Sequence, residues 1–223
     1  YRLDLAGDSG RPEPVTPAGP YRYADGIPVA RGGGEYIYVR EDHSTEGTEA
    51  ENTIVRLHMD GEDCGTVLLS GYDFYSSPKI SPDGEYIAWL CWKHPNMPWD
   101  GTELWKGRLT GDGIAESILV AGGENESIYQ PEWSPEGELF FVSDRNGWWN
   151  LYHNSGRPIV EMDAEFGLPQ WGFGMTSYGF TRTGKIVATY SLDGRRYLAK
   201  LDEDTGSCET IDLPWDNIGG VSF

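Results

Sequence analysis

Short apolar runs follow turn-forming tetrapeptides at four regularly spaced places in the chain. They read RGGGEYIYV at 31–39, SPDGEYIAW at 81–89, SPEGELFFV at 134–142 and TRTGKIVAT at 181–189. Pro82 and Pro135 preset φ at the first central position of a turn. The chain then reverses through positive φ at a glycine, which is Gly84, Gly137 or Gly184. Each copy predicts a turn followed by a β-strand.

A second strand precedes each turn, and two more follow it. The preceding stretches are GIPVA, SPKI, QPEW and SYGF, which place Pro28, Pro78, Pro131 and Tyr178 at equivalent positions. Proline at a fixed strand position indicates an amide that needs no partner in the sheet. The following pairs are NTIVRLHMD and GTVLLSG, TELWKGRLT and ESILVAG, NLYHN and RPIVEMD, and RYLAKLDED and CETIDLP. Four strands per repeat of about 50 residues predict β-propeller blades, which bury both faces by stacking around an axis.

The sequence therefore predicts an all-β fold, a single β-propeller segment over 1–223 built of four-stranded antiparallel blades. The whole blades are expected at about 21–70, 71–122, 123–170 and 171–214. Residues 1–20 are expected to end one partial blade and 215–223 to begin another, so the chain is a segment of a larger propeller, or its terminal strands share one closing blade. The alternative, a β-sandwich, predicts no 50-residue period.

Composition narrows the function classes. The chain has 17 Lys+Arg against 36 Asp+Glu, a net charge of -19, so nucleic acid and anionic membrane surfaces are not expected partners. No apolar run is long enough for a membrane span, and the first ten residues lack the basic flank and apolar core of a signal peptide. The three cysteines, Cys64, Cys91 and Cys208, lack metal-ligand spacing and predict reduced thiols in a cytoplasmic protein. Neither a metal nor a cofactor is expected.

Longer strings resemble a known family. DFYSSPKISPDGEYIAWLCWKHPNMPWDGTELW at 73–105 and ESIYQPEWSPEGELFFVSDRNGWWNLY at 126–152 are similar to the N-terminal propeller of prolyl oligopeptidase family serine peptidases, of the acylaminoacyl-peptidase and dipeptidyl-aminopeptidase type. The stretches 21–43 and 171–180 also resemble that group. The resemblance implies a following α/β-hydrolase domain of the same parent chain with a Ser-Asp-His triad, and a propeller that gates substrate access and contributes to peptide binding.

The chain itself lacks the catalytic elements of that family. A nucleophile elbow needs G-x-S-x-G on a strand-to-helix turn, and no serine fits; Ser9 and Ser155 come nearest. We therefore expect this segment to be non-catalytic. The competing function is a TolB-like scaffold propeller that binds a protein partner, since SPDG turns also occur in TolB-like propellers. A glycosidase with paired carboxylates is unsupported, because no pair stands out among the 36 acidic residues.

A long insertion is the main candidate for substrate or domain-interface binding. WKHPNMPWDGTELW at 92–105 lies between the second and third strands of its blade, where a hairpin needs only a few residues. Proline-stiffened, aromatic loops lose little entropy on binding. The candidate residues are His94, Asn96, Met97, Trp99 and Asp100. The alternative is a self-packed loop at the propeller rim, with Asp100 capping the turn at Gly101.

An acidic pair at the end of the first hairpin is the second candidate. Glu41 and Asp42 precede His43 where a loop opens toward one propeller face. Some dipeptidyl peptidases of the family bind a substrate's free N-terminus with propeller glutamates, and carboxylates suit an ammonium group. The motif does not match residue by residue. The alternative is that EDHSTEGTEAEN is a solvated loop.

Overall fold

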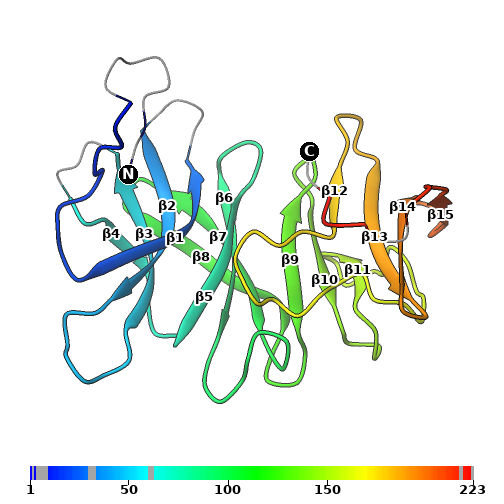
Figure 1. Cartoon of the computed structure of the whole chain (residues 1–223), viewed down its shortest axis with the longest axis horizontal. Coiled ribbons are helices and arrows are strands. Elements are labelled where there is room, and N and C mark those ends of the chain that lie inside the picture. Colours follow the sequence, from blue (N-terminus) through cyan, green and yellow to red (C-terminus); the bar gives the residue numbers. More distant parts are fainter. Residues whose placement is uncertain (2, 4–9, 30–33, 60–62, 216–217, 222–223) are drawn as a thin grey trace.

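The computed structural model describes residues 1, 3, 10–29, 34–59, 63–215 and 218–221. Within these ranges the regular structure consists of β-strands alone. Four antiparallel sheets follow one another in chain order (Figure 1). The first strands of neighbouring sheets lie against each other, β1 (Tyr21–Pro28) against β5 (Phe74–Ile80) and β5 against β9 (Ile128–Trp133). The predicted all-β partial propeller is confirmed, with the first strands innermost.

The first two sheets have the predicted four strands in sequential order. The first contains β1, β2 (Glu35–Asp42), β3 (Glu51–His58) and β4 (Thr66–Leu69). The second contains β5, β6 (Tyr86–Trp92), β7 (Glu103–Thr110) and β8 (Gly113–Gly122). These strands fall within the ranges 21–70 and 71–122.

The third sheet has three strands instead of the predicted four: β9, β10 (Leu139–Ser143) and β11 (Asn150–His153). The segment RPIVEMD forms only an isolated bridge, between Tyr152 and Pro158. Pro158 has no amide to donate. Farther along, the Asn150 side chain takes the place of a strand partner, because it accepts from Met162 N at 2.7 Å and donates to Ala164 O at 3.1 Å.

The fourth sheet again has four strands, β12 (Tyr178–Phe180), β13 (Ile186–Leu192), β14 (Arg195–Leu201) and β15 (Cys208–Ile211). The predicted terminal partial blades fall partly on 2, 4–9, 216–217 and 222–223, outside the described residues. Among the described residues of 1–20 and 215–223 no named strand is present. A Cβ added at Gly220 would lie 2.6 Å from Thr176 O, so this tail runs close beside the entry to β12.

A bulge interrupts three of the innermost strands. The pairing register shifts between Ala24 and Ile27, between Ser76 and Lys79, and opposite Phe140 and Val142. The first bulge residues, Asp25, Ser77 and Gln130, have φ of 53, 53 and 46. Pro78 and Pro131 come next, where no sheet amide is needed. In the first blade the equivalent residue is Gly26, so the predicted equivalence of Pro28 is wrong.

The longer first turn explains this error. Val29 N bonds to Glu35 O in the first blade, whereas Ser134 N bonds to Glu138 O in the third. Because the first turn is longer, counting back from RGGG does not reach the same strand position as counting back from SPDG. Residues 30–33 lie outside the described ranges. The predicted positive φ is present at Gly84, Gly137 and Gly184, with values of 78, 86 and 74.

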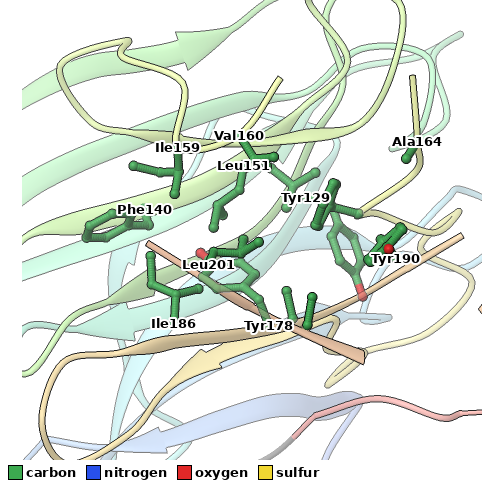
Figure 2. Close-up of a cluster of buried hydrophobic side chains, with 14 residues drawn as sticks. Tyr129, Phe140, Leu151, Ile159, Val160, Ala164, Tyr178, Ile186, Tyr190 and Leu201 are labelled. Carbon is green, nitrogen blue, oxygen red and sulfur yellow. The ribbon is translucent and has the colours of Figure 1, made fainter. Parts of the chain in front are cut away.

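The central strands of the second and third sheets are buried on both faces because each of these sheets packs between two neighbours. Along β6, Ile87 and Trp89 enter the core shared with the first sheet, while Ala88 and Leu90 enter the core shared with the third. The third seam holds the largest cluster, with Tyr129, Phe140 and Tyr178 among its members (Figure 2). Full burial of each such side chain contributes about 1.5–3 kcal/mol. These seams hold the loops at the sheet ends in fixed positions.

Candidate binding face

The loop 93–102 joins β6 to β7 and is held by hydrogen bonds on several sides. Thr102 Oγ1 and Ser127 Oγ both donate to Pro98 O, at 2.8 and 2.9 Å. Asn96 Nδ2 donates to Glu124 O at 2.9 Å. The loop thus lies between the second and third strands of its blade, as the sequence indicated, and is tied to the connection that leads into the third sheet.

Asp100 supports the loop from within. Its Oδ2 accepts a hydrogen bond from Met97 N at 2.9 Å, and its own amide donates to Met97 O at 2.9 Å. Asp100 therefore caps a turn, as in the alternative interpretation, but the capped amide is that of Met97 and not that of Gly101. Met97 itself is 45% exposed. Asp100 therefore has a structural contact, and its exposed carboxylate still borders the outer surface.

His94 joins this loop to the first blade. Its Nε2 lies 2.9 Å from Glu49 Oε2, 45 residues earlier in the chain, and its ring packs edge-on to Phe74. Its backbone amide donates to Asp73 Oδ2 at 2.9 Å. The loop after β2 and the loop after β6 therefore meet on one face of the molecule. No sequence feature identified Glu49 as the partner, because the contact depends on how two blades stack.

Glu41 and Asp42 interact with their own loop. Glu41 Oε2 lies 2.9 Å from His43 Nε2, and Asp42 Oδ1 accepts from Ser44 N at 2.9 Å. The hydrogen bonds from Ser44 lower the pKa of Asp42 below its ordinary value. These contacts are those of a self-capped surface loop, and none of them joins the acidic pair to His94 or Trp99.

Trp99 contacts a second loop that the sequence analysis did not assign to the site. The ring centroids of Trp99 and Trp171 are 4.3 Å apart. Gln170 Nε2 donates to Ser76 Oγ at 3.0 Å and fastens this second loop to β5. Figure 1 shows the connection between β11 and β12, in yellow, passing across the third sheet toward β5. The aromatic run WGFGM is visible in the sequence, but nothing in the sequence indicates that it lies beside Trp99.

A cavity of about 520 Å³ lies behind the loop 93–102. Tyr72 Oη donates to Glu103 Oε2 at 2.5 Å, and Lys93 Nζ lies 4.9 Å from the centre of the Tyr72 ring. Burial, reinforced by the hydrogen bond to Glu103, raises the pKa of Tyr72. Cys91 lines the inner wall, and burial raises the pKa of its thiol as well. Both groups are therefore protonated at neutral pH, and neither is an activated nucleophile.

The described residues contain no cluster of three or more His, Cys, Asp or Glu side chains arranged to hold a metal ion. All three cysteines are free thiols. In the ranges that the structure covers, no helix is long and apolar enough to cross a membrane.

Solved structures similar to this chain include two that hydrolyse puromycin. A puromycin hydrolase is 32% identical with a TM-score of 0.87, and the match covers 97% of this chain and 36% of the hydrolase. A puromycin-hydrolysing peptidase of Mycobacterium tuberculosis is 30% identical with a TM-score of 0.85, covering 93% of this chain and 34% of the peptidase. This chain thus spans about a third of the length of either protein.

More distant structures share the fold alone. TolB from Acinetobacter baumannii is 18% identical with a TM-score of 0.51, over 79% of this chain and 40% of TolB. No protein-family model matches the chain, and no curated protein matches it.

Proposed function

Because this chain is a β-propeller segment of the prolyl oligopeptidase family of serine peptidases, we propose that it gates substrate access and contributes to peptide binding for an α/β-hydrolase domain of the same parent chain. The segment is proposed to be non-catalytic. One observation carries this proposal: the match to two puromycin-hydrolysing enzymes covers 93% and 97% of this chain but only 34% and 36% of theirs. The relatives hold about two thirds of their length outside the matched propeller.

The proposed substrates follow from the same comparison. The sequence resembles peptidases of the acylaminoacyl-peptidase type, and the two relatives hydrolyse puromycin. Aminoacyl and short peptidyl amides are therefore the first compounds to test. Gating is supported by the loops that meet on one face, since loops positioned by a rigid scaffold are common binding sites.

The residues proposed to contact substrate or the hydrolase domain are those of the loop 93–102. Met97 is proposed for this role because its side chain is exposed. Trp99 and Asn96 are proposed because contacts with neighbouring segments hold them in place. His94 and Asp100 are proposed to shape the loop and line its edge. Glu41 and Asp42 are proposed as contacts for a substrate ammonium group. Only their negative charge supports this role, because their hydrogen bonds stay within their own loop.

A cytoplasmic location is proposed from the three free thiols. The excess of 36 acidic over 17 basic residues supports peptides and protein domains as partners, and weighs against nucleic acid and membrane surfaces. No cofactor is proposed.

A side-by-side hydrolysis assay tests the proposal. The 223-residue chain and the product of the whole parent gene are each incubated with puromycin, with aminoacyl chromogenic amides and with a serine-reactive phosphonate. We expect turnover and labelling in the parent alone. An inert, unlabelled parent would favour the TolB-like scaffold, and turnover by the segment itself would reveal a catalytic site in the propeller.

A further inference from the structure

Two tryptophans from separate loops meet on the face that carries the loop 93–102. Trp99 and Trp171 have ring centroids 4.3 Å apart with planes tilted by 48°. We propose that this indole pair is a preformed subsite that binds an aromatic or large apolar side chain of a positively charged peptide. The inference rests on the proposed function and names the class of peptide that this face would select.

Trp171 is exposed to an extent that folding alone does not explain, whereas Trp99 is half-buried. Trp171 is 77% exposed, Phe173 on the same loop is 50% exposed, and Met97 beside Trp99 is 45% exposed. Single exposed apolar residues are ordinary, but large ones gathered on two touching loops are typical of binding surfaces. Tryptophan is also the residue type most enriched among side chains that dominate binding energies.

Both loops are held in place before any ligand arrives. The backbone next to Trp99 is fixed because Pro98 O accepts hydrogen bonds from Thr102 and Ser127. The backbone next to Trp171 is fixed because Gln170 donates to Ser76, whose side chain is fully buried. Binding to a preorganised surface avoids the entropy cost of ordering loops, so a small contact area suffices for measurable affinity.

The position of the pair connects it to gating. Ser76 belongs to β5, the innermost strand of the second blade, and the loop that carries Trp171 leads directly into β12, the innermost strand of the fourth. Figure 1 shows this connection, in yellow, crossing the third sheet toward β5, and Trp99 of the loop 93–102 packs against its Trp171.

The charges around the loop favour a cationic ligand. Its two basic groups already have partners, since Lys93 lies over the Tyr72 ring and His94 contacts Glu49. Asp100 is exposed beside Trp99, and the exposed Glu124 carboxylate has no hydrogen-bond or ion-pair partner among the described residues. The faces of tryptophan rings attract Lys and Arg side chains, and the net charge of -19 steers cations toward the chain.

Isothermal titration with capped pentapeptides tests the subsite. The probes are Ala-Phe-Arg-Phe-Ala, its Glu analogue Ala-Phe-Glu-Phe-Ala, and Ala-Ala-Arg-Ala-Ala. We expect the first to bind the 223-residue chain at least tenfold more tightly than the other two, with a preference over the Glu analogue that shrinks as salt is added. Equal binding of the Arg and Glu peptides would overturn the charge assignment, and no binding of any probe would overturn the subsite.

Matched variants locate the binding. Trp171→Ala is expected to weaken binding of the Arg peptide at least tenfold and to leave folding intact, because the ring is 77% exposed. Trp215→Ala removes an indole that is 66% exposed on another part of the molecule, and is expected to change binding less than twofold. Equal effects of the two variants would overturn the proposal.

Failure of this inference is distinguishable from failure of the proposed function. Phosphonate labelling of the parent protein reports the serine peptidase and does not involve Trp171. A labelled parent whose Trp171→Ala variant binds and cleaves cationic aromatic peptides as well as the wild type contradicts the subsite alone. A Trp171→Ala variant that keeps peptide binding in the segment but loses contact with the hydrolase domain in the parent assigns the pair to a domain interface, and also overturns the proposal.

Discussion

The side chain of Gln130 and the residue Tyr178 hold the third and fourth blades together through reciprocal hydrogen bonds. Gln130 Nε2 donates to Tyr178 O at 2.7 Å, and Tyr178 Oη donates to Gln130 O at 2.9 Å. Gln130 Oε1 also accepts from Ser177 N at 2.6 Å. At the first seam, Asp25 Oδ2 accepts from Ser77 N at 2.6 Å. In both seams a bulge residue satisfies the amide of its counterpart in the next blade.

Gln130→Ala is expected to lower the free energy of unfolding by about 2–4 kcal/mol, because it leaves buried backbone groups of Ser177 and Tyr178 without partners. Urea denaturation of variant and wild type measures the difference. Asn125→Ala removes an exposed amide as the control and is expected to cost less than about 0.5 kcal/mol. Similar midpoints for the two variants would show that the seam does not depend on this side chain.

Gly101→Ala is expected to destabilise the protein by about 1–3 kcal/mol through steric overlap. An added Cβ would lie 2.4 Å from Glu124 O, which is backbone, and 2.5 Å from Asn96 Nδ2, whose side chain is itself held by Glu124 O. Gly111→Ala is the matched control, since nothing lies within 4 Å of its Cβ position. Thermal denaturation should separate the two; a Gly101→Ala protein as stable as Gly111→Ala would mean that the loop 93–102 yields easily.

Asp25 gives the stability a predictable dependence on pH. Burial raises the pKa of Asp25 above its ordinary value of 3.8. The folded state therefore holds this proton more tightly than the unfolded chain does, so the contribution of Asp25 to stability falls as pH rises from 3.8 through the folded pKa, and is constant above it.

Asp25→Asn removes this titration and keeps an oxygen that accepts from Ser77 N. Its stability relative to wild type should rise across that pH window and then level off. Urea denaturation over a series of pH values measures the difference between the two proteins. A relative stability that is constant or falls with pH would contradict the assigned shift.

Cys91 is expected to resist alkylation in the native protein. Its side chain is fully buried, and burial together with Glu103 raises the pKa of its thiol. Mass spectrometry after iodoacetamide treatment at pH 8 should show modification of the half-buried Cys64 before Cys91. In urea both should react. Modification of Cys91 at the rate of Cys64 in native protein would show that the seam opens on the timescale of labelling.

Sequence patterns predicted the blades well because their signals are local. A turn tetrapeptide such as SPDG and an apolar run such as the one through Ile87 and Trp89 depend on neighbouring residues and on a face that alternates along the strand. The fourth strand of the third blade was wrongly predicted, because Asn150 substitutes for strand pairing through a contact with Met162 that spans 12 residues. The misplaced equivalence of Pro28 came from counting back from a turn whose length varies.

The candidate site was predictable only in part. The length and composition of the segment 92–105 identified it as a loop of interest. A turn cap by Asp100 was considered only as the alternative to binding, and at Gly101, whereas its carboxylate accepts from Met97 N. The partners Glu49 and Trp171 have no signal in the sequence next to His94 and Trp99, because each lies on an element of another blade or on the connection between blades.

By itself, then, the sequence determined the strand repeat, the turn geometry, the acidic surface and the resemblance to a peptidase propeller, all of which follow from local residue chemistry and composition. Only the tertiary structure decided which loops meet, that Gln170 fastens one of them to Ser76, and that the half-buried Trp99 packs against the exposed Trp171. These contacts arise when blades pack around an axis, and the distance between their side chains is set by that packing and not by separation along the chain.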